Sequence, residues 1–512
     1  MNSLLTYSSS RYRYLIPLLL IGLCAFLLSY IQPATQEEQG WPLRMSAFLN
    51  EPSFDNFMDA LDNHFTYQWT RDNIRIPQTA GYFLFFLPYV FLCLAASAST
   101  VWMFQASAMV AGVWRRNFTA FSVLAFAMVF LLPWYNDMYC TVWCLNYALP
   151  AALWAYTLWR WLIAPRPLGA SAFFLAFLTA WGHELYGAVL IGSVAGVTIF
   201  YRDRRNRTAL LLICGALIPI IVATLAPCTS YRANHTGESV FTILFFRYPS
   251  WWVYNIMALP TLALAAISGL NGRVRRRCSD AVYWAVGFGA LAGLVVSCLM
   301  GGAPRVSWGV NLGGILFWLM FIQRMWPKVL HRRRILTAVL WTVVAVSYIA
   351  AIRLAWEYRS LIDDAEQNRD AESGTYRVSF VKYPPNDFWT NLITARKVSS
   401  TSGIDWLEDR KVYPYYLQNF TPESSRRLST DLKGATLYQY GQHIIGKVPE
   451  ERPDSFDIII KGSGKEVRTN GYFLPLPLPT DTFTMVNTKE KAFMAIALQG
   501  VEIDSVKFIR LK

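Results

Sequence analysis

The sequence predicts a polytopic α-helical membrane protein with a β-rich C-terminal domain outside the membrane. Three observations lead to this fold class. The 512-residue chain is 54% hydrophobic and 15% aromatic, and several apolar runs reach the length of about eighteen residues that a spanning helix needs. Arginine and lysine gather in short clusters between those runs. From about residue 360, charged residues become more frequent and short β-rich runs replace the long apolar ones.

The apolar runs give the order of the helices. We expect them at about 12–31, 80–104, 118–134, 146–163, 208–226, 249–270, 280–301, 307–324 and 335–356, with a further apolar stretch at 170–200. The first run follows Arg11 and Arg13 but lacks a small-residue cleavage site, so it is expected to stay as an anchor rather than be removed as a signal peptide. This threading predicts about nine full crossings and places every strong basic cluster on the cytoplasmic side.

The stretch from Ala170 to Phe200 carries His183 and Glu184 at its midpoint. At 1.5 Å per residue it would make roughly 45 Å of helix, too long for one crossing and too short for two. Basic residues flank both of its ends, at Arg166 and at Arg202 to Arg207. We therefore predict a re-entrant hairpin of two short helices, broken at Gly182 and Gly187, with His183 and Glu184 at its outer apex beside a cavity. The alternative is one long tilted helix.

This reading divides the chain into a transmembrane domain, 1–358, and a C-terminal periplasmic domain, 359–512. The transmembrane domain includes a long polar first outer loop, 32–79. In the C-terminal domain the clearest strand patterns are at 375–381, 455–461 and 505–511.

The outer face of the threaded chain collects ionisable residues that are not needed as orientation signals. They are Glu37, Glu38, Asp55, Asp59, Asp62, Arg71, Asp72, Arg75, Asp137, His183, Glu184, Arg232, His235 and Arg305. Arginine binds phosphate through paired N–H donors, and a carboxylate can take a proton from an attacking hydroxyl. Such a collection beside a membrane suits a reaction on a lipid-linked phosphate.

Several short strings add a resemblance to a known superfamily. TRDNIR at 70–75, CLNYALP at 144–150, GHELYG at 182–187 and APCTSYRA at 226–233 occur in the order seen in a bacterial multi-pass family. Together with the long acidic first outer loop and the exported C-terminal domain, the chain resembles the GT-C superfamily of polyprenyl-phosphate-dependent glycosyltransferases. The resemblance covers roughly residues 12 to 355.

The resemblance implies that a sugar moves from an undecaprenyl-phosphate carrier to a glycan or lipid-linked acceptor, with inversion, on the outer face of a bacterial inner membrane. A carboxylate of the first outer loop would be the general base. The Asp-Asp pair of the superfamily is absent after the first helix. Asp72 and Glu38 therefore share the assignment of base, and Glu184 is the third catalytic candidate.

The predicted substrate-binding residues are Arg75, His183, Arg232, Arg305, Asn146 and Tyr147. Arg75, Arg232 and Arg305 would hold phosphate, His183 would donate to a phosphate oxygen, and Asn146 and Tyr147 would bind sugar hydroxyls. Most of these residues also have a purely structural explanation. The arginines could contact lipid headgroups, His183 and Glu184 could pair with each other, and Tyr147 could pack in the core. Asp72 could form a salt bridge with Arg71 or Arg75.

Two further groups have simpler explanations. The spacing of Asp55, Asp59 and Asp62 favours a solvated helix face. Trp134, Trp143, Trp181 and Trp308 favour an interfacial aromatic belt over sugar stacking.

Other function classes find little support. The net charge of +14 comes from clusters typical of membrane orientation, so no nucleic-acid partner is expected. The sequence has no HExxH string and no phosphate-binding loop of nucleotide hydrolases. No cofactor is predicted, although some GT-C enzymes use a divalent cation. The main alternative function is a flippase or transporter for a lipid-linked sugar. The one-sided distribution of charge and the lack of an internal sequence repeat argue against it. A third reading is a membrane-anchored scaffold.

Overall fold

The computed structural model describes residues 2–31, 45, 48, 50–70, 75–134, 141–204, 206–229, 255–299, 304–331, 333–367, 376–378, 412–414, 425–440, 443–449, 455–462, 465–474, 490–496 and 502–509. The chain forms two compact units, one of residues 1–356 with 386–396, and one of residues 357–385 with 397–512.

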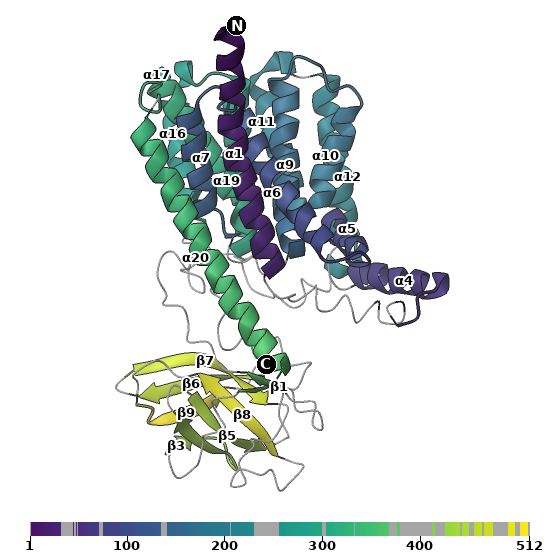
Figure 1. Cartoon of the computed structure of the whole chain (residues 1–512), viewed down its shortest axis with the longest axis vertical. Helices are drawn as coiled ribbons and strands as arrows, with labels where there is room; N and C mark the ends of the chain where they lie inside the picture. The colour runs from purple at the N-terminus through teal and green to yellow at the C-terminus, as the bar shows by residue number, and fades with distance from the viewer. Residues whose placement is uncertain are drawn as a thin grey trace. The chain divides into compact units, whose positions relative to one another are not determined.

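The first unit is helical (Figure 1). Its helices are α1 (Asn2–Ile31), α4 (Phe54–Thr70), α5 (Ile76–Phe85), α6 (Val90–Val110), α7 (Phe118–Leu131), α9 (Thr141–Leu162), α10 (Ser171–Gly182), α11 (Glu184–Phe200), η1 (Arg202–Arg204), α12 (Arg207–Leu225), α16 (Ala258–Leu270), α17 (Gly272–Arg277), α18 (Ala281–Leu299), η3 (Pro304–Ser307), α19 (Trp308–Met325) and α20 (Arg334–Gln367). Within the described residues, five helices are long and apolar enough to cross a membrane, namely α1, α6, α12, α18 and α20. This agrees with a membrane-embedded protein.

One end of the bundle is rich in arginine, and we call it the basic end. Asn117, Asn206 and Asn271 lie directly before α7, α12 and α17, and their side chains accept hydrogen bonds from the first turns of those helices. Asp280 does the same for α18, accepting from Tyr283 N–H at 2.9 Å. The segments between the helices are tied together here. Arg324 pairs with Asp280, Tyr201 donates to the Ser279 carbonyl, and Arg277 donates to the Met325 carbonyl.

The other end, which we call the tip end, contains the predicted hairpin. His183 interrupts the helix with extended backbone (φ −164°, ψ 129°), so that α10 ends at Gly182 and α11 begins at Glu184. A Cβ built at Gly187 would lie 2.7 Å from Ala180 Cβ. In a continuous helix those residues would be roughly 10 Å apart, so α11 folds back along α10. The alternative of one long helix is therefore wrong. The break itself lies at His183, because Gly187 is inside α11 and serves close packing.

Two expectations for the preceding region need correction. A single helix at 80–104 is wrong: α5 ends at Phe85, and α6 begins at Val90 after Pro88, which lacks the N–H that a continuous helix would need. The polar loop 32–79 is also not all loop, because it contains α4, which runs across the bundle axis in Figure 1. Asp55, Asp59 and Asp62 lie exposed on α4, as predicted for a solvated face.

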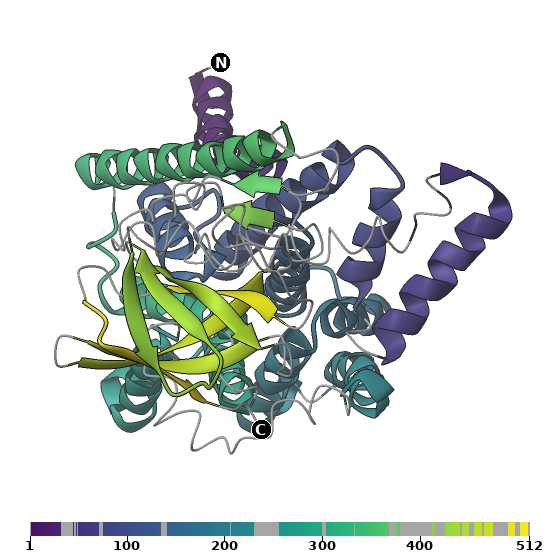
Figure 2. The ribbon, with the colours of Figure 1, turned by 90° about the horizontal axis from the view of Figure 1, so that it is seen from below.

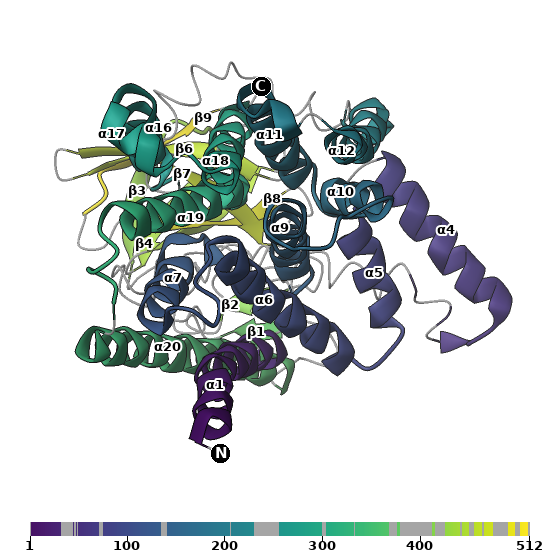
Figure 3. The same cartoon turned by 90° about the horizontal axis from the view of Figure 1, so that it is seen from above.

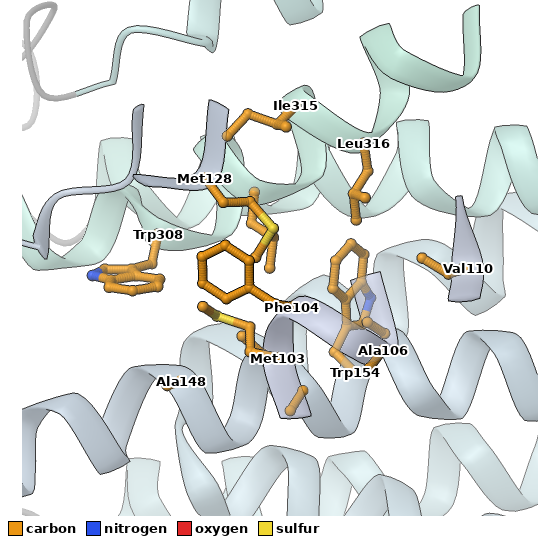
Figure 4. Close-up of a cluster of buried hydrophobic side chains, with 14 of the residues drawn as sticks. Met103, Phe104, Ala106, Val110, Met128, Ala148, Trp154, Trp308, Ile315 and Leu316 are labelled. Carbon is orange, nitrogen blue, oxygen red and sulfur yellow. The ribbon is translucent and has the colours of Figure 1, made fainter. Parts of the chain in front are cut away.

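The helices pack around α9, which lies in the middle when the bundle is viewed along its axis (Figure 3). A layer of large apolar side chains fills the interior between the two ends, including Phe104, Met128, Trp154 and Leu316 (Figure 4). Small residues let the helices approach each other closely. A Cβ at Gly293 in α18 would lie 2.8 Å from the backbone of Gly309 in α19, so any larger residue there would push the helices apart.

The second unit contains the β-strands. They are β1 (Tyr376–Val378), β2 (Val412–Pro414), β3 (Arg426–Thr430), β4 (Thr436–Tyr440), β5 (His443–Pro449), β6 (Ser455–Gly462), β7 (Lys465–Leu474), β8 (Glu490–Ile496) and β9 (Ser505–Ile509). Strands β3 to β9 close into a barrel in the order β3-β4-β5-β8-β7-β6-β9, shown in green and yellow in Figure 2. Its core includes Leu437, Ile444, Ile458 and Val506. Strand β1 lies within the pattern predicted at 375–381, and β6 and β9 coincide closely with those at 455–461 and 505–511.

Candidate functional site

A partly buried ion pair joins two distant parts of the chain at the tip end. Arg75, directly before α5, donates from Nε to Glu184 Oε2 at 2.8 Å and from its Nη2 to Oε1. The Arg75 side chain is 9% exposed and that of Glu184 is 28% exposed. The paired geometry matches the fork of a guanidinium to the two oxygens of a carboxylate, which is the strong form of this interaction. Because both groups are largely withdrawn from solvent, each depends on the other for compensation.

His183 stabilises the turn of the hairpin. Its Nδ1 accepts the backbone N–H of Leu185 at 3.1 Å, which caps the first turn of α11. The same Nδ1 lies 3.6 Å from Glu184 Oε2. A nitrogen that accepts a hydrogen bond carries no proton, so we interpret the 3.6 Å contact as proximity rather than a salt bridge. The ring proton then resides on Nε2, and Glu184 is paired with Arg75 rather than with His183.

Asn146 and Tyr147 come to the same place from α9. Asn146 is 1% exposed, and among the described residues its Oδ1 has no hydrogen-bond partner. Pro150 lies four residues later and has no N–H, so the carbonyl of Asn146 also lacks its usual helical donor. Two acceptors therefore meet at one buried residue. The Tyr147 ring lies 4.7 Å from the His183 ring, centroid to centroid, which connects α9 to the hairpin.

A column of aromatic rings continues from Tyr147 into the bundle. Tyr147 stacks on Trp308 at 5.9 Å, Trp308 meets Trp134 edge to face at 4.8 Å, and Trp134 stacks on Phe104 at 6.3 Å. Trp134 and Trp308 are 3% and 1% exposed, so their assignment to an interfacial belt is wrong. They are core residues that form the inner wall behind His183. Trp181 is half-buried, and the side chain of Trp143 lies outside the described part.

Several helices begin at this position. The first residues of α5, α11 and α19 are Ile76, Glu184 and Trp308, and Asn146 and Tyr147 lie in the second turn of α9. The N-terminal end of a helix carries a partial positive charge. Glu184, the first residue of α11, is well placed in that field, and the same field favours an anionic ligand such as a phosphate.

The remaining predicted residues are only partly described. Asp72, Glu38 and Arg232 lie outside the described residues, as do Glu37, Arg71, Asp137 and His235. Arg305 belongs to η3, immediately before Trp308, so its backbone lies at the tip end, while its side chain is not among those described. The structure thus brings together Arg75, His183, Glu184, Asn146 and Tyr147, which we call the tip site. Their individual assignments to substrate stay predictions.

The partner of Glu184 is not predictable from the sequence. Arg75 is 109 residues away, and nothing in the local pattern of either residue indicates the contact. The missing helical donor for the backbone carbonyl of Asn146 was predictable, because CLNYALP places a proline four residues after the asparagine.

The tip site offers several kinds of interaction to a ligand. Each Glu184 oxygen accepts one bond from Arg75 and keeps a further lone pair, Asn146 supplies acceptors, and the helix N-termini favour negative charge. Within the described ranges, no group of three or more His, Cys, Asp or Glu side chains comes together. Comparisons with protein-family models, with curated proteins and with solved structures found no match.

Proposed function

We propose that the chain is a GT-C type glycosyltransferase that moves a sugar from a polyprenyl-phosphate carrier to a surface glycan or a lipid-linked acceptor. The reaction takes place at the tip site, on the outer face of a bacterial inner membrane, with the C-terminal unit in the periplasm. The proposal includes about nine full crossings with α10 and α11 as a re-entrant hairpin. The observation that carries it is the ion pair of Arg75 with Glu184 at the turn of the hairpin, next to His183, against which Tyr147 of α9 packs.

The electrostatics of the tip site support a phosphate-bearing donor. Helices α5, α11 and α19 begin at Ile76, Glu184 and Trp308, and the partial positive charge at a helix N-terminus favours an anion. The carrier phosphate would bind in that field, with Arg75 and the predicted Arg232 and Arg305 as cationic partners. His183 would donate from Nε2 to a phosphate oxygen.

Asn146 and Glu184 support recognition of hydroxyl groups. A buried acceptor without a partner is costly, and a sugar hydroxyl removes that cost by donating a hydrogen bond. Because Glu184 is already held by two N–H donors, it fits the role of orienting the acceptor hydroxyl better than that of general base. The proton would then pass to Asp72 or Glu38 of the first outer loop.

The apolar layer between the two ends favours an enzyme over a carrier. Phe104, Met128, Trp154 and Leu316 fill the interior (Figure 4), whereas a flippase for a lipid-linked sugar needs a polar route through the bundle. The transporter therefore remains the second candidate.

The proposal is tested first by analysing the surface glycans of cells with and without the protein. The full chain is then assayed in vesicles with a radiolabelled polyprenyl-phosphate sugar and membrane acceptors. Glu184→Gln should lower sugar transfer about a hundredfold, as loss of a positioned charge in a closed site does. The matched control is Asp280→Asn, which alters an arginine–carboxylate pair at the basic end and should leave transfer unchanged.

Two outcomes would contradict the proposal. Equal transfer by the wild type and Glu184→Gln would remove the tip site from the reaction. Movement of the labelled lipid between leaflets without transfer of the sugar would favour the flippase.

A further inference from the structure

A second candidate site lies at the basic end, away from the tip site. A cavity of about 300 Å³ opens between the ends of α6, α9, α18 and α19. Its polar lining comes from Arg116, Asp280 and Arg324, and Trp114 and Trp159 supply aromatic walls. The cavity is therefore large enough for a small ligand with both a charged and an apolar part.

The charges around the cavity do not cancel. Arg324 donates from Nε and Nη2 to Asp280 Oδ2, at 2.7 and 2.6 Å, so these two lining residues neutralise each other. The Asp280 carboxylate is further fixed by Tyr283 N–H on its other oxygen. Arg116 is exposed, and its guanidinium has no partner among the described residues. The lining thus has one uncompensated positive charge.

The helix ends around the cavity do not supply an opposing negative field. The last carbonyls of a helix carry partial negative charge unless they are capped. Here Ala108 O accepts from the N–H groups of both Val113 and Trp114 at 3.0 Å, and Ala111 O accepts from Gln323 at 3.4 Å. Met320 O accepts from Arg324 at 2.9 Å. These capped carbonyls leave the guanidinium of Arg116 as the dominant charge facing the cavity.

The loop that carries Arg116 is held in an unusual conformation. Gly112 has φ 71° and Arg115 has φ 59°, and the second value is uncommon for a residue with a side chain. Between them, Trp114 is fixed by edge-to-face packing against Tyr14 at 5.3 Å. Because of these two left-handed residues, the loop folds back and Trp114 and Arg116 both line the cavity. Backbone strain of this kind persists where surrounding contacts enforce it, and it concentrates at binding sites.

We propose that this cavity binds the phosphate of an anionic ester, with Arg116 as the principal ligand of the phosphate oxygens. Arg324, held in place by Asp280, keeps further N–H donors for the same group. Trp114, Trp159 and Met109 contact the organic part of the ester. Two sources have this chemistry, the headgroup of an anionic phospholipid and a soluble phosphate ester, and basic pockets at helix ends are typical of lipid headgroup sites.

The test uses the purified full chain in a zwitterionic detergent. Binding of dihexanoyl phosphatidylglycerol and of dihexanoyl phosphatidylcholine is measured by native mass spectrometry, and binding of inorganic phosphate by equilibrium dialysis. We expect phosphatidylglycerol, phosphate or both to bind, and phosphatidylcholine to bind more weakly. Arg116→Gln should weaken the anionic probe about tenfold, which corresponds to the loss of one charge-assisted hydrogen bond.

The matched control is Arg273→Gln, which removes one exposed charge at the same end but does not line the cavity. It should bind the probes as the wild type does. Binding of phosphatidylglycerol alone identifies a lipid headgroup, and binding of phosphate alone identifies a soluble ester. The proposal is overturned if neither anionic probe binds, or if Arg116→Gln and Arg273→Gln change the affinity equally.

Discussion

The two ends of the helical bundle each hold an arginine paired with a carboxylate, but the pairs differ in burial. At the tip end, the side chains of Arg75 and Glu184 are 9% and 28% exposed. At the basic end, those of Arg324 and Asp280 are 22% and 44% exposed. Water screens the second pair more strongly and can replace a lost partner. We therefore expect the stability of the fold to depend more strongly on the pair at the tip end than on the pair at the basic end.

The arginines of the two pairs also lie at opposite kinds of helix end. At the tip site Glu184 begins α11 and Arg75 directly precedes α5. At the basic end Asp280 caps the N-terminus of α18, and Arg324 lies in the last turn of α19. Large apolar side chains, among them Phe104, Met128 and Trp154, pack in the interior of the bundle (Figure 4). We therefore expect substitutions at the two pairs to differ in their effects.

The largest effect is expected from Glu184→Ala. This change leaves the guanidinium of Arg75 buried without a partner, and the free energy of unfolding should fall by about 3–5 kcal/mol. Denaturation of the detergent-solubilised protein, followed by tryptophan fluorescence, measures it. The double variant Arg75→Met with Glu184→Met should recover most of the lost stability but no transferase activity. A loss below about 1 kcal/mol for the single variant would show that the pair is solvated after all.

Gly187→Ala tests whether the tight hairpin holds the tip site. The new Cβ would lie 2.7 Å from Ala180 Cβ and 3.0 Å from Ile220 Cδ1, so α10 and α11 must separate. We expect a loss of about 1–3 kcal/mol in unfolding free energy, together with reduced sugar transfer.

Gly269→Ala is the control for this change, because its Cβ meets no atom within 4 Å. It should keep or slightly raise the stability, since alanine favours helix. Equal effects of the two substitutions would refute the close approach of α10 and α11.

Asp280→Asn tests the pair at the basic end. The asparagine keeps an oxygen to cap α18 at Tyr283 but loses the charge that pairs with Arg324. The unfolding free energy should change by at most about 1 kcal/mol, as is usual for partly exposed pairs. A change as large as that of Glu184→Ala in the same fluorescence assay would abolish the distinction between the ends.

Asn146→Leu should have the smallest effect on stability while still impairing function. It removes a buried acceptor that has no partner among the described residues and replaces it with an apolar group of similar size, so the unfolding free energy should stay within about 0.5 kcal/mol. Sugar transfer should fall about tenfold through the loss of a hydrogen bond to a hydroxyl. Unchanged transfer kinetics would assign Asn146 to the scaffold.

Sequence patterns were most informative where a local rule decides the structure. The strand β6 and the break next to Gly182 both follow from residues within a few positions of each other. Local patterns failed in two places. Hydropathy alone predicted one helix across Pro88, where the structure has two. Residue type alone placed Trp134 and Trp308 at the membrane interface, whereas both are buried in the core.

The amino-acid sequence was sufficient to predict that this chain is rich in membrane-compatible helices and that His183 and Glu184 lie at a turn between two helices. Hydropathy, charge and backbone propensity act over a few residues, so they can be read along the chain. Three contacts emerged only from the folded chain: Arg75 neutralises Glu184, Tyr147 and Trp308 stack behind His183, and Arg116 lines a cavity beside Arg324. Those contacts join residues that are far apart in the sequence, and their partners are selected by helix packing, which no local pattern records.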